Sequence, residues 1–176
     1  MPCDGPVHLR RAVPADAPGI AEVHVRSWQK THAALVPPEF AACLSAKRRE
    51  GFWRGEIEVA APGRGPWAAL LDERIVGFAS AGLSRDDDAT PETGEVYHVI
   101  VHPECWGRGI GRNLLSHVLR DLTQHGFGVA TFWVLSGNSS ARRFAEKQGW
   151  RTDGGQRFED CGGTQVPQVR YRRELS

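Results

Sequence analysis

The chain has 176 residues, of which 40% are hydrophobic, and its 22 basic residues almost balance its 21 acidic ones. This length suits a single domain, residues 1–176, with a sizeable core. The near-zero net charge gives no field that would favour nucleic acid or an anionic membrane, so we expect a small-molecule partner instead. No apolar run approaches the roughly 20 residues that span a bilayer, and no secretory signal opens the chain.

The four cysteines are far apart and form no Cys-x-x-Cys pair; they are Cys3, Cys43, Cys105 and Cys161. This spacing implies neither a zinc site nor a disulfide framework. Reduced thiols in a cytoplasmic protein are the simplest interpretation.

The N-terminal third predicts one strand and two helices. Alternation of apolar and polar residues over 7–13 is typical of a half-buried strand, and a helix is expected from Pro14 onward. A second helix, carrying Phe40, is predicted over about Pro38 to Ile57. Its basic run, Lys47 to Arg49, is interpreted as a solvated face, with part of a substrate or phosphate rim as the alternative.

The middle of the chain predicts a hairpin followed by a polar loop. Two apolar runs, 67–71 and 75–81, flank a short turn over 72–74. The acidic run that follows, Asp86 to Asp88, is interpreted as a solvated loop.

The stretch from Val99 to Arg112 predicts a buried strand, a glycine-rich turn and the first turn of a helix. Three glycines at alternate positions let the backbone approach a ligand, and the first amides of a helix favour an anion. Arg108 and Arg112 add mobile cations. The pattern indicates a phosphate cradle, although a structural turn without a ligand, or a site for another phosphate compound such as a nucleotide, remains open.

The next elements place this cradle at a sheet edge. An apolar stripe over 114–122 predicts a helix that Gly126 ends, and a buried strand is expected over 129–135. Strand, helix and strand form a parallel unit, and open α/β sheets bind ligands at the carboxyl edge of such strands.

Two motifs resemble those of the GCN5-related N-acetyltransferases. A hydrophobic strand is followed by Val-x-Pro at 101–103 and by Gly-x-Gly-x-Gly at 107–111. This order is similar to the acetyl-CoA turn of the family, with Trp106 where the family has Gln or Arg. Residues 138–150 are similar to the second acetyl-CoA motif, Asn-x-x-Ala-x-x-Phe-Tyr-Glu-Lys-x-Gly-Phe, with Ala145 in place of the tyrosine that often protonates the leaving thiolate. Residues 25–28 and 35–37 resemble a bacterial branch of the family, with His32 in place of a tyrosine.

The resemblance implies an α/β fold with a single mixed central sheet of about seven strands, flanked by about four helices. It also implies a V-shaped splay between the fourth and fifth strands. The last two strands are expected over about 150–160 and 168–175, and dimerisation through them is possible.

The resemblance further implies acetyl-CoA as co-substrate. The acetyl and pantetheine arm would meet backbone groups of Val99, Ile100 and Val101. The pyrophosphate would meet Gly107, Arg108, Gly109, Ile110, Gly111 and Arg112. Asn138 would bind the end of the pantetheine. Trp106 would cover the turn as an aromatic lid or pack on the adenine or ribose.

The implied reaction is direct attack of a neutral amine on the thioester. Glu95 is the first candidate for the base, since alternation places it on one face with Tyr97 and Val99; a solvated strand-end carboxylate is the alternative. His98 and His32 are further candidates, and no metal is expected because a strand does not present His98 and His102 as a helix would.

A small-molecule amine such as an antibiotic or xenobiotic is the expected acceptor, with a peptide or protein amine as the variant. In this family the loop at 86–88 lies near the acceptor and would attract a cationic amine. The replacement by Ala145 keeps a CoA-binding sensor without turnover as the alternative function.

Overall fold

The computed structural model describes residues 5–32, 36, 38, 44–60, 64–161 and 163–175. The strands of this part are β1 (His8–Arg11), β2 (Gly65–Leu71), β3 (Arg74–Leu83), β4 (Thr93–Val101), β5 (Val129–Leu135), β6 (Arg151–Cys161) and β7 (Thr164–Glu174). The helices are α1 (Ala17–His32), α3 (Ala46–Glu58), α4 (Ile110–Gln124) and α5 (Ser139–Lys147), with short 3₁₀ turns η1 (Pro14–Asp16) and η2 (Pro103–Cys105).

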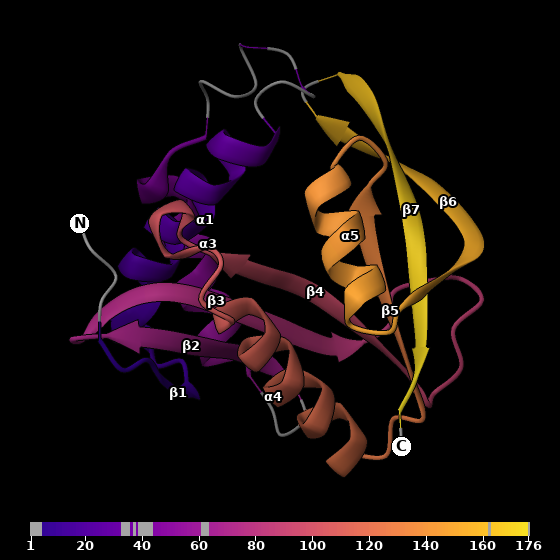
Figure 1. Ribbon diagram of the computed structural model, residues 1–176, viewed down its shortest axis with the longest axis horizontal. Coiled ribbons are helices and arrows are strands. Elements are labelled where there is room, and N and C mark those ends of the chain that lie inside the picture. The colour runs from indigo at the N-terminus through magenta and orange to yellow at the C-terminus, as the bar shows by residue number, and fades with distance from the viewer. Residues whose placement is uncertain are drawn as a thin grey trace.

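The seven strands form one mixed sheet in the order β1-β2-β3-β4-β5-β7-β6 (Figure 1). Only β4 and β5 run parallel among the paired neighbours of this sheet. Their pairing extends from Thr93 opposite Val129 to Val96 opposite Phe132, although both strands continue beyond it. The two strands therefore diverge, which confirms the α/β fold, the mixed sheet and the predicted splay.

Helices cover both faces of the sheet. Apolar residues of α1 and α3 pack with Phe78 of β3 in one cluster on one face. The apolar stripe of α4 packs on the other face, and Ala145 of α5 belongs to the same larger cluster. Figure 1 shows α4 and α5 on the same side of the sheet, with α4 over β3 and β4 and α5 beside β5 and β7.

Two helix starts differ from the prediction. Pro14 opens a 3₁₀ turn, and the α-helix begins three residues later. Helix α3 begins at Ala46, because the side chain of Ser45 accepts a hydrogen bond from the Arg48 amide and caps it. The prediction of one helix from Pro38 to Ile57 is thus wrong at Leu44 and Ser45, which are not helical, whereas Pro38 is helical as predicted. Phe40 lies outside the described residues.

A bulge in β4 changes which residues share a face. Opposite β3, Ser80 pairs with His98 and Ala81 with Val96, so Tyr97 is an extra residue. Val96 and Val99 both pack in the α4 cluster, whereas strict alternation would place them on opposite faces. The prediction that Glu95 shares a face with Val99 is therefore wrong. The bulge instead brings Glu95 and His98 to the same face.

Candidate active site

A cleft of about 1170 Å³ opens where β4 and β5 diverge. The structure brings the predicted site residues other than His32 to its lining, which includes Glu95, His98, Val99, Ile100, Val101, Gly107, Arg108, Gly109, Ile110, Gly111, Arg112 and Asn138. Beyond Val96 no described strand pairs with the edge of β4 that faces β5, so backbone N–H and C=O groups are presented to this cleft.

The glycine turn has the geometry that the motif predicts. Gly107 and Gly109 have φ of 80° and 76°, in the left-handed region that favours glycine. Gly109 is the N-cap of α4, so the amides that follow it lack acceptors within the helix and point outward. Gly111 is helical, and an added Cβ would lie 3.6 Å from Phe144 and Val101, an ordinary contact. The backbone approach therefore depends on the first two glycines.

Trp106 fastens the turn to the strand before it. Its indole Nε1 donates a hydrogen bond of 2.8 Å to the Val101 carbonyl, and 44% of the side chain is exposed. The ring thus satisfies one of the backbone groups at the diverging edge of β4 and fixes the loop that leads into α4.

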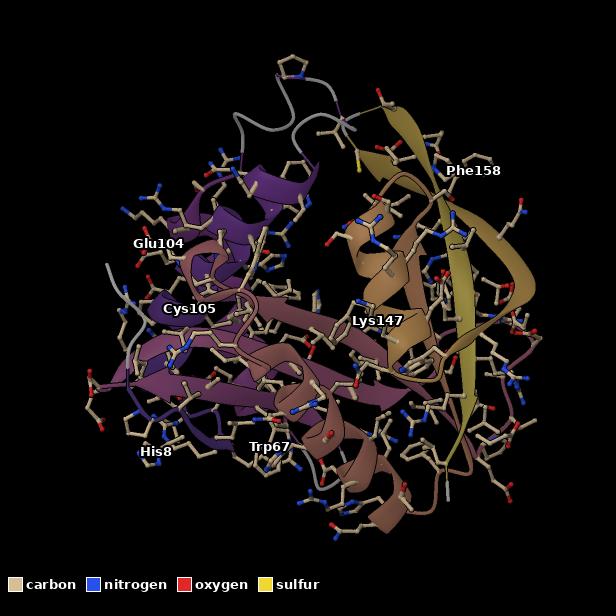
Figure 2. The ribbon with its side chains drawn as sticks, viewed as in Figure 1. His8, Trp67, Glu104, Cys105, Lys147 and Phe158 are labelled. Atoms are coloured by element: carbon tan, nitrogen blue, oxygen red, sulfur yellow. The ribbon has the colours of Figure 1, made fainter. Side chains whose placement is uncertain are left out.

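Cys105, labelled in Figure 2 on the loop between β4 and α4, is fully buried and disulfide-bonded. The expectation of reduced thiols is wrong for this residue. Cys161 is a free, buried thiol whose pKa is raised, chiefly by burial.

Glu95 is 4% exposed, so it is not a solvated strand-end carboxylate. One carboxylate oxygen accepts a hydrogen bond of 3.0 Å from the Arg85 amide. Burial, with a smaller contribution from nearby Asp86, raises the pKa of the Glu95 carboxyl above its usual range. A carboxylate with a raised pKa is a stronger proton acceptor than a solvated one.

His98 lies on the same face, packed among rings. Its Nδ1 lies 2.9 Å from the Ser80 hydroxyl, and its ring centroid lies 5.4 Å from that of His24 and 5.0 Å from that of Trp53. Burial, with the positive charges of Arg49 and Arg85, lowers the pKa of His98 to about 4. The imidazole is therefore neutral at pH 7. The side chain of His32 lies outside the described residues.

The acidic loop after β3 is tied to the sheet. Asp86 accepts hydrogen bonds from Trp133 Nε1 (2.9 Å) and from Arg170 (3.2 Å). Arg170 also pairs with Asp88 at 2.6 Å, which lowers the pKa of that carboxyl. The interpretation of this run as a solvated loop is wrong for Asp86, and the carboxylates of both residues already hold a cation.

The second motif forms α5. The side chain of Asn138 accepts a hydrogen bond of 3.0 Å from the Ala141 amide and caps this helix. Ala145 is fully buried in the core. Tyr171 of β7 is fully buried, and its hydroxyl donates a hydrogen bond of 2.8 Å to Glu146 of α5.

Several cleft residues were not identified from the sequence. The lining also includes Trp28, Arg49, Arg85, Trp133, Arg157 and Gln168. Two of them carried a signal: Arg49 is one end of the basic run for which a substrate rim was the alternative, and Trp28 lies in the segment 25–28 that resembles the bacterial branch. Lys47 and Arg48 are exposed, as the interpretation of a solvated face predicts, whereas Arg49 lines the cleft.

A mixed sheet that splays beside a glycine turn and a helix N-terminus defines an α/β domain with a ligand cleft at the divergence of β4 and β5. Residues 23–150 match the model of the acetyltransferase (GNAT) family. The uncharacterized N-acetyltransferase YuaI of Bacillus subtilis is 33% identical over 136 residues, which cover 76% of this chain and 75% of YuaI. The chain belongs to the GNAT family.

Solved structures share the fold. The PaiA N-acetyltransferase of Thermoplasma acidophilum, in complex with coenzyme A, superimposes with a TM-score of 0.74 at 18% identity and covers 97% of this chain and 99% of that one. YncA of Salmonella typhimurium, with its cofactor acetyl-CoA, gives 0.74 at 23% identity and covers 98% and 95%. Among the described residues, no helix is long and apolar enough to cross a membrane.

Proposed function

We propose that this protein transfers the acetyl group of acetyl-CoA to the primary amine of a small molecule. One observation carries the proposal: a glycine turn and a pair of side chains that can transfer protons line the same cleft along the diverging edge of β4. The glycine turn at the N-terminus of α4 opens into it, and Glu95 and His98 line it from the opposite face of β4. One feature suits the phosphates of the donor and the other suits proton transfer from an amine.

The residues at the turn fit the cofactor. Gly107 and Gly109 leave the backbone open, and the first amides of α4, from Ile110 to Arg112, would bind the pyrophosphate. The arm of the cofactor would lie along Val99 to Val101, where the strand edge offers hydrogen bonds. The neighbours of known structure that carry coenzyme A or acetyl-CoA support this assignment.

The chemistry is a direct transfer. The neutral amine attacks the thioester carbonyl, a C–N bond forms, the C–S bond breaks, and coenzyme A leaves as a thiolate. Free N–H groups on the edge of β4 would stabilise the oxyanion. A thiol has a pKa of about 8.5, so its thiolate leaves without an acid at moderate cost, and Ala145 at the tyrosine position does not abolish transfer.

Glu95 is assigned as the base that takes the proton of the attacking amine. Its raised pKa brings it closer to neutrality, where a base is most effective. His98, with a pKa of about 4, is a weaker base and would serve as a neutral hydrogen-bonding group beside the amine. We assign it the second catalytic position, and the cleft needs no metal for this reaction.

The test is a transfer assay with acetyl-CoA and a panel of primary amines, in which thiol release and the acetylated product are both measured. The proposal predicts product for at least one small amine, and loss of product with Glu95→Gln. Turnover of a peptide amine alone would move the assignment to the peptide variant. Thiol release without any acetylated amine would contradict the proposal.

A CoA-binding sensor is the second candidate, and Ala145 is the observation that favours it. That function predicts tight acetyl-CoA binding with no transfer to any amine. Competition by ATP for the same cleft would instead indicate a nucleotide site. A homodimer and a cytoplasmic location remain predictions for the chain.

A further inference from the structure

We propose that the acceptor amine also carries a carboxylate, and that Arg49 and Arg85 bind it on the acceptor side of the cleft. This inference rests on the proposed function and names its substrate class: a small amino acid or a similar zwitterion. It follows from the position of the two guanidinium groups and from what their neighbours already bind.

Arg49 is placed by the first turn of α3. It precedes Trp53 by four residues, so the two side chains lie on one face of the helix. Trp53 is 1% exposed and packs 5.0 Å from the ring of His98, which directs this face toward the cleft. Arg49 is half-buried and lines the cleft one turn before Trp53.

Arg85 approaches from the end of β3. Its guanidinium carbon lies 4.1 Å from the centroid of the Tyr97 ring, and its backbone amide donates to Glu95. Tyr97 is the bulge residue between the two proposed catalytic side chains. The cation is thus held beside the position that the amine would occupy.

The charge of both arginines reaches the centre of the cleft. Each of them lowers the pKa of His98 through its positive potential, after the larger effect of burial. A second positive group at this point, such as the distant ammonium of a polyamine, would be repelled by the same field.

Neither Arg49 nor Arg85 forms an ion pair with any residue that the structure describes. Two other carboxylates of this region have partners of their own: Asp86 binds Arg170 and Trp133, and Glu159 accepts a hydrogen bond of 2.7 Å from Gln168. By contrast, Arg54 on the same helix pairs with Glu50 at 3.0 Å. Arg85 also attracts the carboxylate of Glu95, whose pKa its charge lowers, without forming an ion pair with it. Two guanidinium groups in one cleft without an ion pair to any described residue suit an anionic ligand, and guanidinium matches a carboxylate in shape.

The ligand would therefore span the cleft. Its amine would lie at Glu95, near the thioester, and its carboxylate would lie toward the arginines that flank His98. A carboxylate would also compensate the field that disfavours a bare ammonium. Polycationic amines, such as polyamines and aminoglycosides, are expected to be poor acceptors.

The experiment compares leucine with isoamylamine, which is leucine without its carboxylate, as acceptors for the wild type and for Arg49→Gln, Arg85→Gln and Arg49→Lys. Arg54→Gln is the matched control on the same helix. We expect kcat/KM to favour leucine by at least about tenfold, as one charge-assisted contact provides. Each glutamine variant should reduce that preference about tenfold, and Arg49→Lys should retain part of it. The KM for acetyl-CoA and the Arg54→Gln enzyme should be unchanged.

A second measurement does not depend on turnover. Calorimetry of N-acetylleucine and of N-isoamylacetamide, with coenzyme A present, reports whether a carboxylate strengthens binding. A carboxylate preference that Arg49→Gln and Arg85→Gln remove supports the inference even if no amine is acetylated, in which case the proposed function alone fails. Equal binding of the two amides, or a preference that both variants leave intact, overturns the inference.

Discussion

The two halves of the cleft are built from different parts of the chain. The half that we assign to the cofactor, called the cofactor half below, consists mainly of backbone: the glycine turn, the first amides of α4 and the edge of β4 beyond Val96. The acceptor half consists of side chains, with Glu95 and His98 from β4, Arg49 from α3 and Arg85 from the loop after β3. The backbone groups of the cofactor half come mainly from one short stretch of sequence. The side chains of the acceptor half come from segments that are far apart in the sequence.

The largest expected effect separates catalysis from cofactor binding. Glu95→Gln removes the base but keeps an acceptor for the Arg85 amide, so kcat should fall by about 10²–10³. The affinity for acetyl-CoA, measured by calorimetry, should stay within about twofold, because the change lies in the acceptor half. A variant with near-normal kcat would show that another group accepts the proton.

The same residue predicts a pH profile. Since burial raises the pKa of Glu95, the limb on which kcat rises with pH should lie above the pH at which a solvated carboxylate ionises. The Glu95→Gln enzyme should lose that limb. A wild-type limb at the ordinary carboxylate pKa would contradict the assignment.

The next effect concerns the cofactor half. Gly109→Glu forces φ of 76° on a residue with a side chain and adds a carboxylate at the cradle. Acetyl-CoA binding should weaken by about 100-fold or more through charge repulsion. Gly126→Glu is the matched control, because Gly126 has φ of 86° just beyond the far end of α4 and an added Cβ would meet no atom within 4 Å. Equal losses in both variants would indicate strain rather than repulsion.

A third effect concerns the stability of the acceptor half. The pKa of His98 is depressed to about 4, so between its unfolded value and that pH the unfolded chain binds more protons than the folded one. The free energy of unfolding should therefore fall as the pH falls from about 6.5 toward 4. His98→Asn should reduce this fall by on the order of 1 kcal/mol in urea titrations, a value discounted for partial exposure. If the free energy of unfolding fell equally with pH in the wild type and in His98→Asn, the depressed pKa of His98 would be refuted.

The smallest effect tests the link between loop and strand. Trp106→Phe deletes the hydrogen bond to the Val101 carbonyl, which contributes about 1 kcal/mol. Acetyl-CoA affinity should fall about fivefold, while the leucine preference stays unchanged. A variant with a changed leucine preference and normal cofactor affinity would break the separation of the two halves.

The sequence predicted the geometry of the glycine turn because local chemistry defines it, whereas its role in binding the cofactor stays a prediction. Left-handed glycines and a helix N-terminus leave a pattern within a dozen residues, and Asp72 and Glu73 likewise adopt the left-handed angles of the predicted hairpin turn. The strand divergence followed from the family resemblance rather than from the pattern of apolar residues.

The acceptor half was less predictable because it depends on long-range geometry. No local signal marks Tyr97 as a bulge residue, and the bulge alone decides that Glu95 and His98 share a face. The position of the Arg49 side chain in the cleft depends on α3 beginning at Ala46. The partner of Asp88 is Arg170, 82 residues away, so the acidic loop looked solvated in the sequence.

The most direct test is calorimetric titration of acetyl-CoA and of coenzyme A into the wild-type protein, with ATP as competitor. The account predicts one site per chain with Kd of about 1–100 μM for both the thioester and the free thiol, the range of ordinary enzyme–substrate affinities, and no displacement by ATP. Absence of heat with both compounds, or displacement by ATP, would contradict the assignment of the cleft to acetyl-CoA.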